Sequence, residues 1–356
     1  MSNARKLADN LPTDGQLSGR NVVINGNFDV SQRGTSFTNI GSGGGGTSGY
    51  DDTWTMDRFL ISQGQSAGRC SVEQSTDRPS GFSKSLKIST TTADTSIAAA
   101  EYHRLQTKFE GRDLKRFCKG NSDAKEWTLS FYCKANANAT YVVELYDTDN
   151  SRSVSKTFSV TTNWTRVIVT FPADTTSGTG FNNDSNLSLE LNWWMHAGST
   201  YSGGTLQTTW GSLVQANRAA GISSIFDSTS RTFFITGVQL EAGSQASPFE
   251  HEPFGVTYSK CCRYYWDMSF PSSGKTSWLF PINTNNSNGY RRATIHTPIN
   301  MRAVPTYTAS LVHSGGTSGV DGGVWAGPNT AGLYVNSINS ESDYAYCNSL
   351  KADAEL

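Results

Sequence analysis

Histidine, cysteine and carboxylate side chains are the groups in this sequence that could carry acid–base, nucleophilic or metal chemistry. The five histidines are His103, His196, His251, His296 and His313. None belongs to an HExxH zinc motif, because Pro253 follows the His251-Glu252 pair and would stop the helix that this motif requires. The sequence has no GxSxG nucleophile elbow, and its scattered carboxylates form no recognisable glycosidase pair. It therefore predicts no catalytic residues.

Metal-binding spacing is missing as well. The six cysteines include no CxxC pair and no zinc-ligand spacing. The stretch Asp147-Thr148-Asp149-Asn150-Ser151 carries oxygen ligands like a calcium loop, but Arg152 stands where an EF-hand loop needs glycine. A hairpin turn is the expected structure there, and we expect neither a metal nor another cofactor.

Aromatic side chains are the better candidates for contact with a ligand. Trp193 and Trp194 are adjacent in a predicted strand, so they must point to opposite faces of its sheet. Trp193 shares its face with three leucines and is expected in the core, whereas Trp194 shares its face with polar residues and should face solvent or a partner. Tyr201 and Trp210 follow in a Gly- and Thr-rich segment. We predict that Trp194, Tyr201 and Trp210 bind a glycan by stacking, although packing between protomers or within the chain would use the same rings.

The composition is typical of an all-β protein. Hydrophobic residues make up 36% and charged residues only 17%, and 34 residues are glycine, so long amphipathic helices lack their usual building blocks. The net charge of -1 argues against a nucleic-acid partner, which would need an excess of basic charge. No segment approaches the roughly 18 consecutive apolar residues of a membrane span, and residues 1–20 lack the apolar core of a signal peptide.

Short strand patterns recur from residue 21 to residue 240, separated by Gly, Asn, Asp and Ser, as in a sandwich or barrel. The first covers residues 21–30, and the only convincing helix nearby covers residues 110–119. Residues 156–160 and 165–171 bracket a four-residue loop and predict a hairpin. In the last strand, Gly237 allows a bulge that resets the register.

Several stretches resemble the β-jelly-roll domain of bacteriophage tail-fibre and related virion proteins. Residues 25–35 read NGNFDVSQRGT, similar to the NGNF-x-x-x-QRGTS opening of that domain, and Asp57-Arg58-Phe59 resembles its DRW element. Residues 237–265, GVQLEAGSQASPFEHEPFGVTYSKCCRYY, resemble its end. Residues 301–306, MRAVPT, are similar to the MR-x-x-P-T phrase of phage fibre tips.

This resemblance implies an all-β chain of three parts: a short N-terminal leader (residues 1–20), a β-jelly-roll sandwich (21–253) and a small C-terminal β domain (254–356). It implies a non-catalytic structural component of a phage tail, a fibre or adhesin that mediates assembly and host-surface attachment. The chain would be made in the host cytoplasm, dock on other tail proteins through its leader, and sit in the virion as a homotrimer.

The phage domains are similar in turn to carbohydrate-binding jelly rolls, which makes a host-surface glycan an expected ligand. In that wider family carboxylates hold a structural calcium, and Asp29 fits one position. The closing strand, however, reads Gly237-Val238-Gln239-Leu240 where an acidic pair would be expected. Two other functions stay open, namely a stand-alone glycan-binding module and a polysaccharide-degrading tailspike enzyme whose acids come from different strands.

Overall fold

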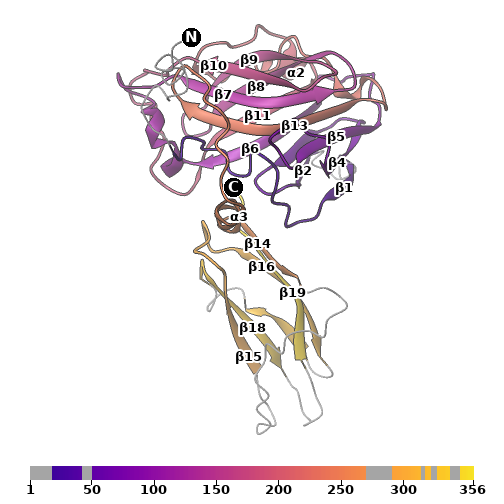
Figure 1. Cartoon of the computed structure of the whole chain (residues 1–356), viewed down its shortest axis with the longest axis vertical. Coiled ribbons are helices and arrows are strands. Elements are labelled where there is room, and N and C mark those ends of the chain that lie inside the picture. Colours follow the sequence, from indigo (N-terminus) through magenta and orange to yellow (C-terminus); the bar gives the residue numbers. More distant parts are fainter. Residues whose placement is uncertain (1–17, 42–49, 270–290, 314–316, 322–326, 337–344) are drawn as a thin grey trace. The chain divides into compact units, whose positions relative to one another are not determined.

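The structure is a computed structural model of the 356-residue chain and describes residues 18–41, 50–269, 291–313, 317–321, 327–336 and 345–356. The chain divides into two compact units, Met1–Phe254 with Leu356, and Gly255–Glu355. Both units consist mainly of antiparallel strands (Figure 1), so the predicted all-β class is confirmed. Residues 1–17 of the predicted leader lie outside the described residues.

The first unit is a jelly-roll sandwich of two antiparallel sheets, as predicted. The six-stranded sheet has the order β1-β4-β5-β13-β7-β10, formed by β1 (Ser36–Ile40), β4 (Arg69–Ser75), β5 (Ser85–Thr92), β13 (Thr232–Ala242), β7 (Trp127–Ala135) and β10 (Thr165–Phe171). The seven-stranded sheet has the order β12-β9-β8-β11-β6-β3-β2, formed by β12 (Gly211–Ser212), β9 (Arg152–Val160), β8 (Ala139–Asp147), β11 (Leu187–Ala197), β6 (Tyr102–Glu110), β3 (Leu60–Gly64) and β2 (Tyr50–Trp54). Most neighbours within a sheet are not consecutive in the sequence.

Alternating side chains fill the space between the two sheets. On β11, Leu191 and Trp193 are fully buried in the main core, and on β6 Leu105 occupies the same core. The helix predicted at residues 110–119 is a 3-10 helix, η2 (Gly111–Phe117), whose Phe117 ring stacks on another core ring, Trp127, at 3.6 Å between centroids. The period-2 pattern therefore identified the core-facing residues of these strands correctly.

The hairpin predicted from residues 156–160 and 165–171 is not present. β9 pairs with β8 and β12 in the seven-stranded sheet, whereas β10 pairs with β7 in the six-stranded sheet. Residues 161–164 therefore cross from one sheet to the other. Val160 and Phe171 both reach the core, so the two strands share a core from opposite sheets. Two strands that face each other across a core and two that pair side by side have the same apolar pattern in sequence.

The strand predicted at residues 21–30 is also absent. These residues are turn and coil, because Asn25 and Phe28 have φ angles of 60° and 57°, in the left-handed region that interrupts a strand. We call residues 21–32 the closure segment, because they cover an edge of the closing strand, β13.

The closure segment supplies the hydrogen bonds that neighbouring strands do not give to β13. β13 pairs with β5 only over residues 232–235, and its register with β7 shifts between Thr236 and Gln239. The predicted bulge is therefore confirmed, with φ of 63° at Gly237. Val238 donates its N–H to the Gly26 carbonyl at 2.9 Å, and its own carbonyl accepts from Asn21 Nδ2 at 3.0 Å. Asn21 Oδ1 also accepts the N–H of Leu240 at 3.0 Å.

Buried side chains hold the closure segment in its turn. Asn25 is 3% exposed; its Nδ2 donates to the carbonyls of Val30 and Asp57 at 2.9 Å each, and its Oδ1 accepts the Val30 N–H at 3.0 Å. The Asp57 carboxylate accepts the backbone and side-chain N–H groups of Gln32, each at 2.6 Å. A Cβ at Gly26 would lie 2.1 Å from the Val238 carbonyl oxygen, so only glycine fits. The residues that carry the phage resemblance are thus largely those that close the sandwich.

A helix that the sequence does not predict, α3 (Phe254–Cys262), starts at the boundary between the units and forms the first element of the second unit. Its two three-stranded sheets have the orders β14-β19-β16 and β15-β18-β17, formed by β14 (Tyr265–Ser269), β19 (Ala345–Asp353), β16 (Thr306–His313), β15 (Arg291–His296), β18 (Thr330–Asn336) and β17 (Thr317–Asp321). Met301, Ala352 and Ala354 form a small core in this unit. In the part of the chain that the structure describes, no helix is long and apolar enough to span a membrane.

Candidate functional site

The outer face of the seven-stranded sheet carries the polar groups that could contact a ligand. Side chains alternate along each strand, and the strand register sets their rows. The outward residues of the central strands are Arg104, Gln106 and Lys108 on β6, Glu190, Asn192 and Trp194 on β11, and Val142, Glu144 and Tyr146 on β8. This face therefore combines charged, amide and aromatic groups on a rigid sheet.

Trp194 lies on this face, opposite Trp193 as predicted, but it is only 1% exposed. The predicted exposure of Trp194 is therefore wrong. The segment that follows β11, with α2 (Ser199–Ser202), η3 (Gln215–Asn217) and buried Ala219, covers the ring. Strand parity gives the face on which a side chain lies, but it does not report what packs on that face.

Two cations and two tyrosines surround the Trp194 ring. The guanidinium carbons of Arg104 and Arg218 lie 5.2 and 4.9 Å from its centroid. The ring centroids of Tyr102 and Tyr201 lie at 6.0 and 5.3 Å. The structure thus brings predicted site residues Trp194 and Tyr201 together, with Tyr201 half-buried. The sequence predicts that the Trp194 ring stacks on a sugar. In the structure, the ring instead makes cation–π contacts with two arginines of the same chain.

Glu144 is the anchor of this covered region. Its side chain is fully buried and accepts both Nε and NH2 of Arg218, at 2.7 and 2.9 Å. Trp194 Nε1 and Asn192 Nδ2 donate to the same carboxylate at 2.8 and 3.1 Å. Asn192 Oδ1 in turn accepts from Gln106 Nε2 at 2.7 Å. This buried network ties the covering segment to the sheet through Arg218.

Two carboxylates converge on this face, which is the arrangement that a glycosidase would need. Glu190 Oε2 lies 3.4 Å from the same Asn192 Nδ2 that contacts Glu144, and 3.7 Å from Arg104 NH1. Glu144, however, is inaccessible to solvent and already accepts four N–H donors. It has neither the access nor the spare lone pairs that an acid, base or nucleophile requires.

One row across the sheet does reach solvent. The register places Lys108 beside Glu190 and Glu190 beside Tyr146. Lys108 Nζ also lies 5.7 Å from the ring centroid of Trp54 on β2. Trp54, Lys108 and Tyr146 are half-buried, and Glu190 is 9% exposed. We call these four residues the sheet row.

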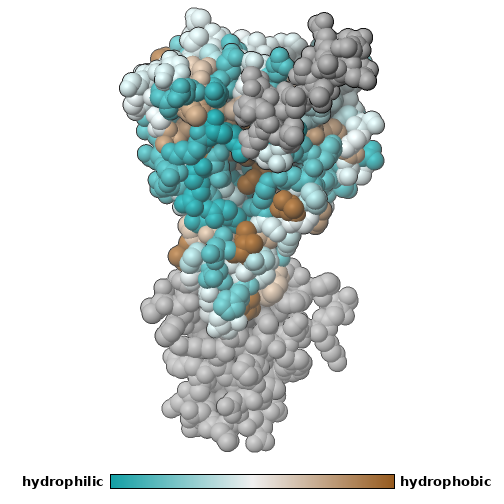
Figure 2. All heavy atoms as spheres, turned by 60° about the vertical axis from the view of Figure 1, so that its left-hand side comes forward, coloured by the Kyte–Doolittle hydropathy of each residue, from teal (hydrophilic) through white to brown (hydrophobic). Residues whose placement is uncertain are grey.

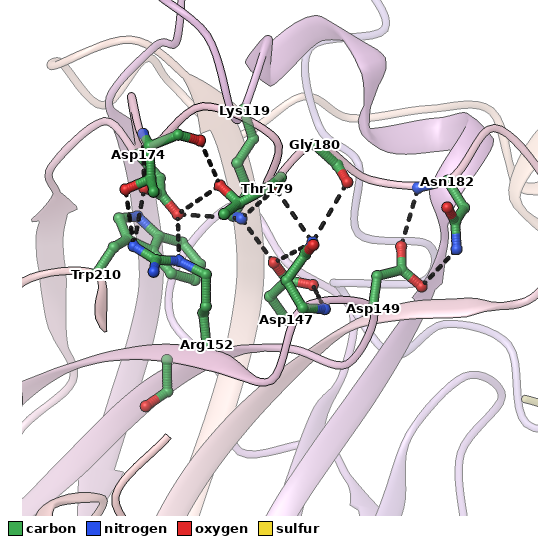
Figure 3. Close-up of polar contacts among 12 residues, drawn as sticks. Lys119, Asp147, Asp149, Arg152, Asp174, Thr179, Gly180, Asn182 and Trp210 are labelled. Atoms are coloured by element: carbon green, nitrogen blue, oxygen red, sulfur yellow. Dashed lines mark hydrogen bonds and ion pairs between the residues drawn. The ribbon is translucent and has the colours of Figure 1, made fainter. Parts of the chain in front are cut away.

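Trp210, the third predicted site residue, lies apart from this row in a cluster of buried charges (Figure 3). Lys119 Nζ lies 5.2 Å from its ring centroid, and Trp210 Nε1 donates to the Pro172 carbonyl at 2.9 Å. The Lys119 side chain is fully buried and pairs with Asp147 at 2.6 Å and Asp174 at 3.0 Å. Trp210 therefore packs within the chain, one of the alternatives that the sequence left open.

The turn between β8 and β9 belongs to the same cluster. Asp147 Oδ2 contacts Lys119, and the Asp149 carboxylate accepts the backbone and side-chain N–H groups of Asn182 at 3.0 and 3.1 Å (Figure 3). β8 and β9 pair antiparallel around this turn, so the predicted hairpin turn is confirmed. Its acidic oxygens bind groups of the protein, and the charges here hold the loop at residues 174–182 against the sheet.

Comparisons with known proteins add little to this picture. No family model matches the sequence, and no curated protein matches it. Among solved structures, a CBM4 protein is 12% identical, with 61% of this chain and 97% of that chain covered and a TM-score of 0.29. The family 11 carbohydrate-binding module of a cellulosomal cellulase of Clostridium thermocellum is 9% identical (58% and 96% covered, TM-score 0.28), and a family 30 carbohydrate-binding module is 12% identical (63% and 98% covered, TM-score 0.30). TM-scores below 0.5 do not establish a shared fold, so the fold assignment rests on the strand order of this chain.

Removing the charge of Glu144 should destabilise the first unit strongly. The substitution Glu144→Gln leaves the Arg218 guanidinium, 6% exposed, without its anion, which costs about 3–5 kcal/mol for a buried pair. The free energy of unfolding in urea measures this loss. The double variant Glu144→Gln/Arg218→Met should regain part of it, because the unpaired charge is then removed.

The matched control is Glu73→Gln. Glu73 pairs with Lys87 at 2.8 Å across two neighbouring strands, but its side chain is 46% exposed. This variant should change the free energy of unfolding by less than about 1 kcal/mol. Equal effects of Glu144→Gln and Glu73→Gln would contradict the anchoring role of Glu144.

Acid should weaken the cluster around Lys119 as Asp174 becomes protonated. Burial alone would raise the pKa of Asp174, but hydrogen bonds from Arg152, Thr176 and Lys119 outweigh it and lower the pKa to about 2. A pKa below that of the unfolded chain gives stability that is present above about pH 4 and is lost as the pH falls towards 2. Urea unfolding across this range should show a weaker loss of stability with falling pH for Asp174→Asn than for the unchanged chain. Identical pH slopes would show that Asp174 carries none of this linkage.

Proposed function

We propose that this chain is a non-catalytic carbohydrate-binding protein whose first unit contacts the ligand through the sheet row. The observation that carries the proposal is the combination of two aromatic and two charged side chains in that row. The register sets Glu190 between Lys108 and Tyr146. The Trp54 ring, in the neighbouring register row of the same face, lies beside Lys108, whose Nζ also donates to the Leu356 carbonyl at 2.8 Å. A sugar offers an apolar ring face for stacking and hydroxyl groups for hydrogen bonds, and this row provides partners for both.

The rigidity of the sheet supports this role. Arg104 holds Glu190 from the neighbouring strand at 3.7 Å, and Arg218 lies 5.0 Å from the Tyr146 ring centroid. Side chains that neighbours already hold lose little conformational entropy on binding. Hydrophilic residues also predominate on the described surface that Figure 2 shows, with hydrophobic residues in a few separate spots. Contact through polar groups is the mode that such a surface offers.

The finer proposal is that the chain works in a bacteriophage tail as a fibre or adhesin. It is supported by the similarity of residues 25–35, 57–59 and 237–265 to virion jelly rolls. In this proposal the leader docks on other tail proteins, three copies assemble into a homotrimer, and the sheet row contacts a host-surface glycan. A stand-alone glycan-binding module has the same binding surface without the virion.

Binding of the full chain to an array of bacterial surface glycans tests the carbohydrate proposal. Tyr146→Ala and Trp54→Ala remove the aromatic side chains of the row, and each lost stacking contact of this kind costs about 1 kcal/mol or more. We expect each variant to weaken binding by about fivefold or more, measured by titration with the glycan that binds best.

Trp164→Ala is the matched control, because Trp164 is another half-buried tryptophan, lying between β9 and β10 with its Nε1 bonded to Asp77 at 2.9 Å. It should leave glycan binding unchanged. Absence of any glycan ligand, or equal losses in all three variants, would contradict the proposal. Release of reducing ends from the bound glycan would instead support the enzyme alternative.

Assembly is tested separately by light scattering of the purified full chain. The trimer proposal predicts a particle of about three times 38.6 kDa at micromolar concentration. A uniform monomer would contradict it and favour the stand-alone module. Mass spectrometry of purified phage particles then reports whether the chain is a virion component.

A further inference from the structure

Three potential metal ligands meet at one end of the sandwich, away from the sheet row. Asp94 follows β5, Glu101 precedes β6, and His196 lies near the end of β11. One ligand atom from each lies within 4.8 Å of the other two. Asp94 and Glu101 are each 6% exposed, and His196 is fully buried. Polar groups this close to one another inside a protein need partners that compensate for their lost hydration.

The imidazole of His196 is held in a fixed orientation. Its Nδ1 lies 2.7 Å from Ser224 Oγ, and this hydroxyl can accept the Nδ1–H. Nε2 then carries a lone pair and lies 3.4 Å from Glu101 Oε2. This separation is longer than an ordinary hydrogen bond, but two donors on one tetrahedral Zn²⁺ lie about 3.4 Å apart, given bonds of about 2.0–2.1 Å.

Asp94 is also held in position by hydrogen bonds. Its Oδ2 accepts from Ser66 Oγ at 2.8 Å and from the Ala67 N–H at 2.9 Å, and its own N–H donates to the Phe226 carbonyl at 2.8 Å. These contacts fix the carboxylate and use both lone pairs of Oδ2, whereas Oδ1 accepts only the Ser96 N–H, at 3.3 Å, and keeps one lone pair for a metal. A metal ligand typically has such partners outside the metal's own coordination sphere.

A second buried imidazole lies beside His196 on the neighbouring strand. The register places His103 opposite His196, and both rings pack on Phe226, with centroids 4.8 and 5.2 Å away. Gln63 Nε2 donates to the Gly68 carbonyl at 2.7 Å, so Gln63 Oε1 must accept from His103 Nδ1, at 3.0 Å. His103 Nε2 therefore carries a lone pair. It is buried and has no hydrogen-bond partner among the described residues.

We propose that Asp94, Glu101 and His196 bind a borderline divalent transition metal, Zn²⁺ being the best match, which pins the β5–β6 connection to the end of β11. One imidazole with two carboxylates suits such an ion, whereas Ca²⁺ and Mg²⁺ prefer oxygen ligands alone. Because the donors lie at most 4.8 Å apart, shortening their separations by up to about 1.4 Å brings all three to tetrahedral spacing. A water molecule would complete four ligands. The sequence predicts no metal, because these ligands come from separate segments and form no motif.

Metal binding by the full chain, first stripped with a chelator, tests this site. Calorimetric titration with Zn²⁺ should show about one equivalent bound per chain, with a rise in the unfolding temperature. Ca²⁺ and Mg²⁺ should give neither effect. Glu101→Gln and His196→Gln should each abolish this equivalent, and Ser224→Ala, which removes only the partner of Nδ1, should weaken it about 10- to 100-fold.

Two matched controls exclude other ligands. His251→Gln makes the same change at an exposed histidine, and Cys118→Ser removes a half-buried thiol; both should leave the titration unchanged. Substitution with Co²⁺ gives a readout that does not depend on folding energy, because thiolate ligands produce a charge-transfer band that carboxylate and imidazole ligands do not. If His196→Gln fails to fold, the Zn²⁺ titration of Glu101→Gln and the Co²⁺ spectrum still test whether these residues bind the metal. No saturable binding of Zn²⁺, binding that survives Glu101→Gln, or a thiolate band would overturn the proposal.

Discussion

The fold depends on how the closing strand β13 completes its hydrogen bonds. A strand inside a sandwich must pair its backbone groups, because a buried N–H or carbonyl without a partner costs about 1–3 kcal/mol. Beyond residue 235 β13 has no β5 partner, and a bulge interrupts its pairing with β7. The amide of Asn21 and the carbonyl of Gly26 take the place of a neighbouring strand. The first described residues and the last strand of the sandwich therefore stabilise each other.

Two buried charge clusters then fix the loops on this framework. Glu144 holds the segment that covers Trp194 through Arg218, and Lys119 holds the loop at residues 174–182 through Asp147 and Asp174. The many partners of these ionised groups indicate that they stabilise the fold. What remains for a ligand is the rim of the sheet, where aromatic and charged side chains are only partly covered. The proposed function, contact with a glycan at a rigid surface, uses these partly covered groups.

The sequence predicted the sandwich well, because its strands alternate between core and surface and its turns are marked by small polar residues. The predicted core position of Trp193 and the bulge at Gly237 both follow from local rules. The crossing from β9 in one sheet to β10 in the other was not predictable. Apolar residues alternate in the same way in two strands that pair within a sheet and in two strands that face each other across the core. The sequence predicts a strand at residues 21–30, because the apolar residues there follow a strand pattern and nothing in that pattern reveals the left-handed φ angle of Asn25.

The sequence predicted the surroundings of the site residues less accurately than it predicted the fold, for a physical reason. The sequence places Trp194 on the correct face, but Arg218 and Ala219, which help to cover it, are more than twenty positions away in the sequence and show no periodicity. The sheet row is likewise assembled by register, which brings Lys108 next to Glu190 across a long connection. Pairing between distant strands decides such neighbours, and no local pattern encodes it.

The most direct test of this account compares two neighbouring asparagines of the closure segment by urea unfolding. Asn25→Ala removes three buried hydrogen bonds and leaves alanine in a left-handed conformation, so it should lower the free energy of unfolding by roughly 2–4 kcal/mol. Asn27→Ala loses only a bond to Asp29 at a partly exposed position and should cost less than about 1 kcal/mol. Equal, small losses in the two variants would contradict the claim that the closure segment completes the closing strand.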